Sequence, residues 1–93
     1  MYRVLLTASA VSVLQKLHPE IRKAARDTLR ELARHPFSGK ELQAELRGFR
    51  SYRFRRYRII FRVHPDRKEL VVWAIGHRRD IYETFGQYLV AEQ

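Results

Sequence analysis

Arginine is concentrated in one short stretch of this sequence. Between Glu45 and Asp66 there are seven arginines and no acidic residue. The guanidinium group is planar, stays charged at neutral pH and presents a fork of N–H donors that fits the oxygens of a phosphate group. A solubilising role on an exposed sheet face is the structural alternative. The clustering favours a surface that binds an anion, and phosphate is the anion that arginine matches best.

A second basic cluster follows at residues 76–82, with the sequence Gly-His-Arg-Arg-Asp-Ile-Tyr. It comes directly after an apolar stretch that is typical of a buried strand, so it lies at the C-terminal end of that strand. His77 adds an imidazole, whose unperturbed pKa of about 6.5 suits proton transfer, although a histidine at a strand end is more often structural. No two histidines or carboxylates in this basic region have the spacing of metal ligands, so we predict no metal site.

The elements that must position these clusters begin with a hairpin over residues 49–63. Apolar residues alternate with polar ones through both halves, which predicts two antiparallel strands with one apolar face. A two-residue turn at 55–56 places Arg53 opposite Arg58, and like charges in such a pair are destabilising unless an anion lies between them. The aromatic residues of the hairpin share its apolar face and are predicted to be core rather than base-stacking residues. They are Tyr52, Phe54, Tyr57 and Phe61.

Two helices are predicted before the hairpin. After a strand at residues 2–6, residues 7–9 offer capping hydroxyls for a helix that runs to about residue 17. Pro19 suits the first position of a second helix, which ends near His35. Arginines recur every four residues on the second helix, opposite its apolar stripe, and we interpret them as a solvated face rather than an RNA-docking stripe. They are Arg22, Arg26, Arg30 and Arg34.

The remaining segments complete the predicted fold. Residues 36–48 indicate a loop or partial helix that places Leu42 and Leu46 on the core. Residues 70–75 are apolar without alternation, which predicts a central strand covered on both sides. A C-terminal helix is predicted from the spacing of Ile81, Phe85, Tyr88 and Leu89. The fold class is therefore α+β: an N-terminal strand, a helical hairpin packed on a small antiparallel β-sheet, and a C-terminal helix, with the other sheet face left for function.

Composition narrows the class of protein and its partners. The chain has 93 residues, which we predict to form a single domain, 1–93. Its formal net charge of +9 predicts a polyanionic partner such as nucleic acid, or an acidic protein. The absence of cysteine excludes disulfides, zinc–thiolate sites and a cysteine nucleophile. No long apolar stretch is typical of a signal peptide or a membrane span, so we expect a cytoplasmic protein that does not enter a membrane.

These motifs together resemble a known family. The sequence Tyr-Arg-Phe-Arg-Arg-Tyr-Arg-Ile-Ile-Phe at 52–61, followed by an apolar strand and the cluster at 76–82, resembles the signature of the RelE/ParE toxins of type II toxin–antitoxin systems. The resemblance covers essentially the whole chain, because the order of elements and the length also agree. The Tyr57-Arg58 step is shared across the superfamily. The cluster at 76–82 is more specific, and it is more similar to the RNA-cleaving RelE branch than to the gyrase-poisoning ParE branch.

The resemblance to the RelE branch implies a reaction. Such a toxin is a ribosome-dependent endoribonuclease, or mRNA interferase. It enters the ribosomal decoding site and cuts messenger RNA by attack of a ribose 2′-hydroxyl on the adjacent phosphate, which leaves a 2′,3′-cyclic phosphate and a 5′-hydroxyl. The reaction needs no metal ion or other cofactor. Fixed guanidinium groups suit it, because they stabilise the anionic transition state without reorganising.

The resemblance also implies roles for individual residues. By their matching positions, Arg58 holds the scissile phosphate and Arg78 protonates or stabilises the leaving 5′-oxygen. Arg53 matches a basic residue near the attacking hydroxyl, and Tyr82 stacks on or positions a nucleotide. The other arginines of the two clusters are predicted to contact RNA. They are Arg50, Arg55, Arg56 and Arg79.

The general base is the point at which this chain departs from the family pattern. The best-known member carries lysines on the first hairpin strand, where this chain has Ser51 and Arg53. Arginine, with a pKa above about 12, does not readily accept a proton near neutrality. Either the mechanism rests on electrostatics alone, or His77 acts as the catalytic base.

Two other functions are compatible with the sequence. A ParE-like chain would inhibit DNA gyrase without catalytic residues of its own, and a basic module could bind RNA or the ribosome without toxicity. Under both toxin hypotheses the implied partner is a small antitoxin, acidic in its toxin-binding segment because the toxin carries a charge of +9. The ribonuclease hypothesis adds the ribosome and messenger RNA as partners.

Overall fold

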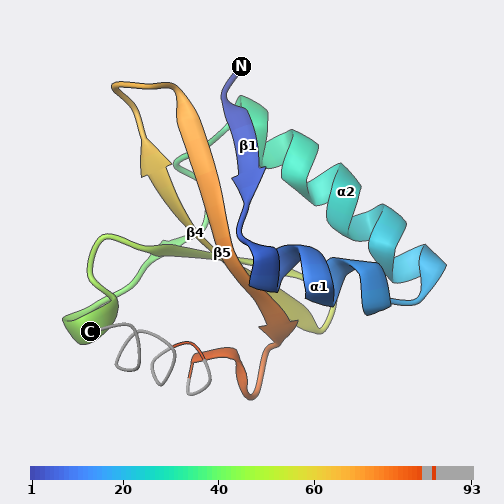
Figure 1. Cartoon of the computed structure of the whole chain (residues 1–93). Coiled ribbons are helices and arrows are strands. Elements are labelled where there is room, and N and C mark those ends of the chain that lie inside the picture. The colour runs from blue at the N-terminus through green and yellow to red at the C-terminus, as the bar shows by residue number, and fades with distance from the viewer. Residues whose placement is uncertain (83–84, 86–93) are drawn as a thin grey trace.

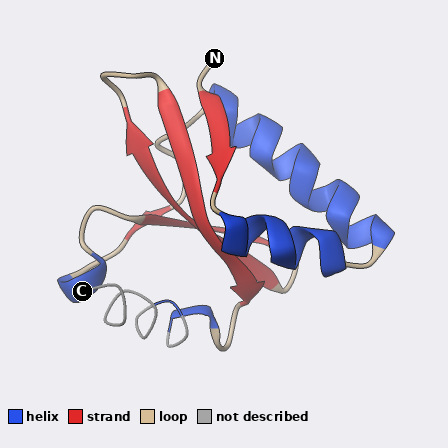
Figure 2. Cartoon of the chain, in the orientation of Figure 1, coloured by secondary structure: helices blue, strands red, loops and turns tan. Residues whose placement is uncertain are grey.

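The protein is an α+β structure in which two helices precede most of a five-stranded sheet (Figures 1 and 2). The computed structural model describes residues 1–82 and Phe85. The elements are β1 (Arg3–Leu6), α1 (Ala8–Lys16), α2 (Pro19–Arg34), β2 (Lys40–Glu41), the 3-10 helix η1 (Ala44–Leu46), β3 (Arg50–Phe54), β4 (Tyr57–His64) and β5 (Glu69–His77). The predicted fold class and the position of both helices are confirmed.

The sheet is mixed rather than purely antiparallel. Its strand order is β1-β5-β4-β3-β2, and β2 to β5 pair antiparallel with their neighbours. Strand β1 pairs with β5 in parallel, as Figure 1 shows at the edge of the sheet beside the helices. A parallel pair needs a long connection across one face, and the two helices belong to that connection. The strand at 70–75 that we predict to be central is part of β5. Strand β5 is an interior strand of the sheet, and β4 is the middle one.

A β-bulge in β5 explains why its sequence does not alternate. Ile60 pairs with Ala74 and Phe61 with Val72, so Trp73 is an extra residue opposite this pair. Such a bulge puts two consecutive residues on the same side of the strand. Trp73 and Ala74 accordingly pack together in one cluster, while Val72 is buried in the cluster on the opposite face. The apolar run at 70–75 therefore supplies both faces of the sheet.

Each face of the sheet carries an apolar cluster. The helix-facing cluster buries Ala10, Leu17, Ala25, Leu29, Leu32, Phe54, Ile59, Phe61, Leu70, Val72 and Ile75. The opposite cluster buries Leu42, Phe49, Ile60, Ile81 and Phe85, with Leu46, Trp73, Ala74 and Tyr82 packed against it. The prediction that this second face is left for function is therefore wrong for much of its area. The cause is that the segment at 42–49 and the residues Ile81, Tyr82 and Phe85 cover it.

The helix ends follow the predicted signals. The Thr7 hydroxyl accepts a hydrogen bond from the Ala10 N–H at the start of α1, and Pro19 is the first residue of α2. Arg22 donates to the carbonyl oxygens of Gln15 and Leu17, which satisfies the C-terminal end of α1. The other arginines of the α2 stripe, Arg26, Arg30 and Arg34, are exposed, as expected of a solvated face.

The C-terminal helix is described only at its beginning. Ile81, Tyr82 and Phe85 have helical conformation. The predicted helix residues Tyr88 and Leu89 lie outside the described residues. No helix in the described part of the chain is long and apolar enough to cross a membrane.

A candidate phosphate-binding site at the hairpin end of the sheet

The hairpin of β3 and β4 has the predicted register. Phe54 pairs with Tyr57 and Arg53 with Arg58, so residues 55–56 form a two-residue turn. Arg55 has a φ of 52°, a left-handed conformation that favours glycine over a residue with a side chain. Such a residue costs about 1 to 3 kcal/mol and is frequent at functional sites.

A buried serine joins two of the predicted site residues. Ser51 is 1% exposed, and its Oγ accepts hydrogen bonds from Arg58 Nη1 at 3.1 Å and from the Tyr82 hydroxyl at 2.9 Å. The Arg58 guanidinium carbon also lies 5.8 Å from the centre of the Tyr82 ring, within the range of a cation–π contact. Two side chains 24 positions apart in the sequence are thus held together at one end of the sheet.

Arg53 shares the sheet face of Arg58, because the two residues are cross-strand partners. Its Nε donates to the Arg55 carbonyl oxygen at 3.3 Å, and its side chain is exposed. None of the ion pairs found between described residues involves Arg53, Arg58 or an arginine of the 55–56 turn. The charge of this face is therefore not neutralised by carboxylates in the described part of the chain, which suits it to an anionic ligand.

The two basic clusters of the sequence meet at the hairpin turn. The Arg78 N–H donates to the Arg56 carbonyl oxygen at 2.9 Å, which fastens the segment after β5 to the turn. A hollow of about 310 Å³ lies between them and is lined by Arg56, His77, Arg78 and Arg79. Every side chain that lines this hollow is a cation or an imidazole. This lining suits an anion such as a phosphate group, and Arg58 and Tyr82 are not part of it.

His77 lies on the opposite face of the sheet from Arg58. It is the last residue of β5 and pairs with Tyr57, and its ring lies edge-on to the Tyr57 ring at 6.0 Å. Tyr57 packs against the helix-facing core, whereas the adjacent pair of Arg58 and Gly76 points to the other face. His77 Nδ1 accepts a long hydrogen bond from the Arg79 N–H at 3.5 Å. In the neutral ring that bond leaves the proton on Nε2, which then donates rather than accepts.

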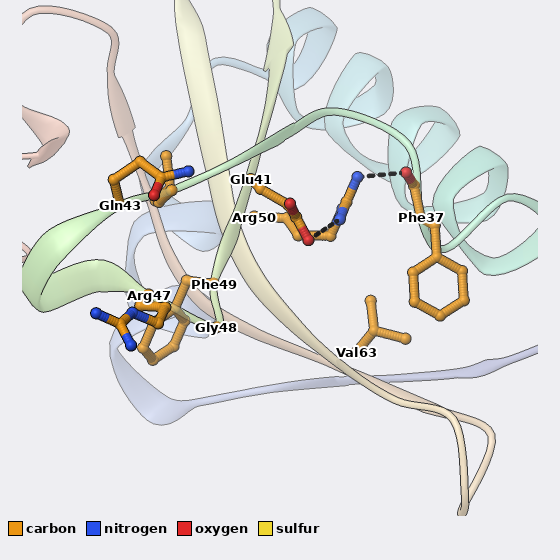
Figure 3. A pocket seen from close by; sticks show the side chains of 9 residues that line it. Phe37, Glu41, Gln43, Arg47, Gly48, Phe49, Arg50 and Val63 are labelled. Atoms are coloured by element: carbon orange, nitrogen blue, oxygen red, sulfur yellow. Dashed lines mark hydrogen bonds and ion pairs between the residues drawn. The ribbon is translucent and has the colours of Figure 1, made fainter.

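Arg50, one of the arginines predicted to contact RNA, is engaged within the protein (Figure 3). Its guanidinium donates to the carbonyl oxygens of Phe37 at 2.6 Å, Ser38 at 3.2 Å and Gly39 at 3.3 Å. It also pairs with the Glu41 carboxylate at 3.4 Å, and its side chain is 16% exposed. These bonds fasten the segment before β2 to β3, so this arginine supports the fold and does not face the hairpin site.

The described residues offer no obvious metal site. Across 1–82 and 85, no three His, Cys, Asp or Glu side chains gather closely enough to hold a metal ion. The side chains at the hairpin end offer guanidinium, imidazole, phenol and hydroxyl groups.

Sequence reasoning missed Ser51 as a site residue. Its position is visible only as a small polar residue two places before Arg53, on the strand face that Arg58 also uses. Its partner Tyr82 lies 31 positions further along the chain, and no local pattern indicates that contact. The one signal at this position is that Ser51 stands where the family pattern has a lysine, which marks a departure but not a contact with Tyr82.

Comparisons with known proteins identify the family of this chain. The family described as the ParE toxin of type II toxin–antitoxin systems matches residues 4–82. Toxin RelG of Mycobacterium tuberculosis is 36% identical over 83 residues, which cover 87% of this chain and 95% of that protein. The toxin in the RelBE2 toxin–antitoxin complex of M. tuberculosis is 34% identical with a TM-score of 0.78, over 83% of this chain and 98% of that one.

The isolated RelE toxin of E. coli shares the fold at lower sequence identity. It has a TM-score of 0.73 and is 18% identical, over 96% of this chain and 99% of that one. The two helices, the sheet and the family match therefore define a small toxin of the RelE/ParE type. The chain belongs to the RelE/ParE superfamily of type II toxin–antitoxin toxins, as its sequence motifs predict.

Proposed function

We propose that this toxin is a ribosome-dependent endoribonuclease that cuts messenger RNA. The observation that carries the proposal is the pair of Arg58 and Tyr82, bonded to the buried Ser51 hydroxyl beside the exposed Arg53. A fixed guanidinium next to a fixed phenol suits a phosphate and its attached nucleoside. The similarity to Toxin RelG and to RelE structures supports the same branch of the superfamily.

In the proposed reaction the 2′-oxygen forms a bond to phosphorus and the bond from phosphorus to the 5′-oxygen breaks. Arg58 binds the non-bridging oxygens and stabilises the extra negative charge of the transition state. Arg78 either stabilises the leaving 5′-oxygen with a hydrogen bond while solvent protonates it, or protonates it and regains a proton from solvent, so the oxygen leaves as a 5′-hydroxyl. Arg53 lies on the Arg58 face and lowers the cost of ionising the 2′-hydroxyl, whose proton passes to solvent.

The position of His77 supports the electrostatic form of this mechanism. Its ring packs on Tyr57, on the face away from Arg58, and its Nδ1 already accepts a backbone hydrogen bond. A general base must reach the proton it removes, within hydrogen-bond distance or through one water. In this proposal His77 therefore shapes the hollow beside Arg78, and it does not act as the base.

Dependence on the ribosome follows from the openness of the site. The site lies at the end of a small sheet, where the hairpin turns. The hollow beside it is lined mainly by long arginine side chains. Such a site stabilises charge but does little to align the attacking 2′-hydroxyl with the leaving oxygen. Alignment contributes a large share of the rate in such reactions. The ribosome would supply it by holding the messenger in the decoding site.

An acidic antitoxin is the proposed protein partner. The RelBE2 complex of M. tuberculosis and the RelBE complex of E. coli are both toxin–antitoxin complexes. The net charge of +9 would attract a negatively charged segment over several ångströms and accelerate its association. We place this complex in the cytoplasm, where ribosomes and messenger RNA are also found.

Inhibition of DNA gyrase is the second candidate function. The family that matches residues 4–82 is described as a ParE toxin, which is the observation that favours it. Purified protein should be incubated in parallel with programmed ribosomes and with gyrase plus supercoiled DNA. Cleavage of messenger only when ribosomes are present supports the ribonuclease. Trapping of gyrase on DNA with the messenger intact supports the gyrase inhibitor instead.

A further inference from the structure

We propose that Ser51 is a positioning residue that fixes the orientations of Arg58 and Tyr82 relative to each other. The inference rests on the proposed ribonuclease function and concerns the same site. Ser51 itself would not contact the RNA, because its side chain is buried beneath the two residues it binds. It would act through their geometry.

The burial of Ser51 is unusual for its chemistry. Within residues 1–82 and 85 it is the one buried polar side chain, and the rest of the buried set is apolar. It lies on β3 between two neighbours, opposite Lys40 of β2 and Ile60 of β4. A buried hydroxyl is costly unless it is hydrogen-bonded, and this one is bonded to two functional side chains. The bonds that satisfy the serine also restrain its partners.

A single oxygen accepts both hydrogen bonds. Arg58 Nη1 and the Tyr82 hydroxyl approach Ser51 Oγ at 3.1 Å and 2.9 Å. Neither donor can swing away without breaking a bond in a water-poor setting, where such bonds are electrostatically strong. The position of the guanidinium on β4 is therefore coupled to the position of the phenol in the segment after β5.

The backbone that carries Ser51 is fixed as well. A Cβ atom placed on Gly39, whose φ is 84°, would lie 2.4 Å from the Ser51 carbonyl oxygen, so the residue before β2 approaches β3 as closely as glycine allows. The carbonyl oxygens of Phe37, Ser38 and Gly39 are in turn held by Arg50. The serine thus rests on a rigid support, which a positioning residue requires.

The effect of this support falls on the transition state. Arg58 already has one nitrogen committed to Ser51, so the direction of its remaining N–H donors is set before RNA binds. A guanidinium that rotates freely still attracts a phosphate in the ground state but stabilises the transition state less well. Loss of the hydroxyl should therefore lower kcat with little change in KM.

The test compares Ser51→Ala with Ser51→Thr and Ile60→Val in steady-state cleavage on programmed ribosomes, which gives kcat and KM separately. We expect kcat to fall about 10- to 100-fold in Ser51→Ala with KM nearly unchanged, since small misplacements of catalytic groups have effects of this size. Ser51→Thr retains the hydroxyl and should recover most of the rate. Ile60→Val is the matched packing control on the cross-strand partner, and it should lower the melting temperature without lowering kcat.

A second pair of measurements separates positioning from folding. Tyr82→Phe removes the hydrogen bond between Tyr82 and Ser51 from the other side. In the double variant, Ser51→Ala with Tyr82→Phe, the fold loss of kcat should therefore be smaller than the product of the two single losses. Multiplicative effects, an unchanged rate in Ser51→Ala, or an equal loss in Ile60→Val would each overturn the proposal.

NMR of the free protein keeps this inference distinct from the proposed function. The side-chain N–H signals of Arg58 should be slow to exchange in the wild type and fast in Ser51→Ala. If the wild type cuts no RNA but shows this difference, the ribonuclease proposal fails while the serine is shown to hold the pair. If the signals are the same in both proteins, the positioning role is wrong whatever the activity.

Discussion

The two ends of strand β5 differ in what surrounds their arginines. At the Glu69 end, Arg3 and Arg67 both pair with the Glu69 carboxylate. These pairs join the edge strand β1 and the turn between β4 and β5 to the start of β5. At the His77 end, neither Arg58 nor Arg78 has a carboxylate partner among the described residues. Arginines of the first kind have their charge matched within the protein. Arginines of the second kind, on a rigid sheet end, are available to an anion from outside.

The same contrast divides the arginines of β3 itself. Arg50 is bonded to three carbonyl oxygens and one carboxylate, whereas Arg53, three positions further along, is exposed beside Arg58. Both are arginines of the same strand. The presence of backbone acceptors within reach separates a structural arginine from one that a ligand can use.

The largest expected effect is on the arginines at the His77 end. Arg58→Ala and Arg78→Ala should each abolish growth inhibition and lower ribosome-dependent cleavage by about 10² or more, because each removes a fixed charge from the transition state. Their melting temperatures should change little, because the relief of like-charge repulsion on this face offsets the loss of the bond from Arg58 to Ser51. Arg67→Ala at the Glu69 end is the matched control and should retain activity. A large loss of stability in either site variant would make that arginine structural.

Arg50→Ala should give the opposite result, with stability lost and activity kept. Removing the guanidinium leaves three carbonyl oxygens and the Glu41 carboxylate without their donor, at a cost of about 1 to 3 kcal/mol. Denaturant unfolding measures the loss, and cleavage per folded molecule measures activity. Arg47→Ala, an exposed neighbour, should change neither. If Arg50→Ala is stable but does not bind RNA, our structural interpretation of Arg50 is wrong.

A smaller effect is expected at Glu69 and depends on pH. The hydrogen bond from Arg3 lowers the pKa of the Glu69 carboxyl below its ordinary value, with further lowering from the Arg67 charge. A group whose pKa is lower in the folded state stabilises the fold above its unfolded pKa, about 4.3, and loses that contribution as pH falls through the folded value.

Glu69→Gln should therefore melt slightly below the wild type at neutral pH and together with it in strong acid. The effect stays small because exposed ion pairs are screened by water and salt. Thermal melts across pH in low and high salt check this, and a gap that persists in strong acid would point to a packing effect of the substitution rather than to charge.

The smallest effect is expected at His77. Because its ring faces away from Arg58, His77→Ala should leave the pH profile of single-turnover cleavage unchanged. Arg53→Lys should be tolerated or even faster, since a lysine in a crowded cationic site can lose its proton. Loss of an acidic limb near pH 6.5 in His77→Ala, with a rate about 10² to 10⁴ lower, would identify the histidine as the base.

Local patterns predicted most of the framework. The period of two and the residues available for the turn gave the hairpin register, including Arg53 opposite Arg58, and the aromatics Tyr52 and Tyr57 pack on the core as expected. Capping signals at Thr7 and Pro19 marked the helix starts. These features depend on residues close in the sequence, so sequence alone contains them.

The features that were missed depend on contacts between distant segments. Nothing near residues 2–6 signals that β1 pairs in parallel with β5, because strand direction is set by the path of the helices. The bulge at Trp73 needs the register of β4, and the role of Arg50 needs the segment at 37–39. For the site, the arginines were recognised by type, but the bonds from Arg58 and Tyr82 to Ser51 were not.

The chemical ends of the RNA provide the most direct test of the central claim. The purified protein should first be treated with EDTA and then dialysed, with untreated protein as the control. Both samples should be incubated with programmed ribosomes at a magnesium level that keeps the ribosomes intact. The RNA fragments should then be analysed by mass spectrometry. The account predicts cuts within the messenger that require ribosomes and leave a 2′,3′-cyclic phosphate and a 5′-hydroxyl, with no cuts by Arg58→Ala. Rapid cutting of ribosome-free RNA, 5′-phosphate ends, or an intact messenger with gyrase trapped on DNA would contradict it.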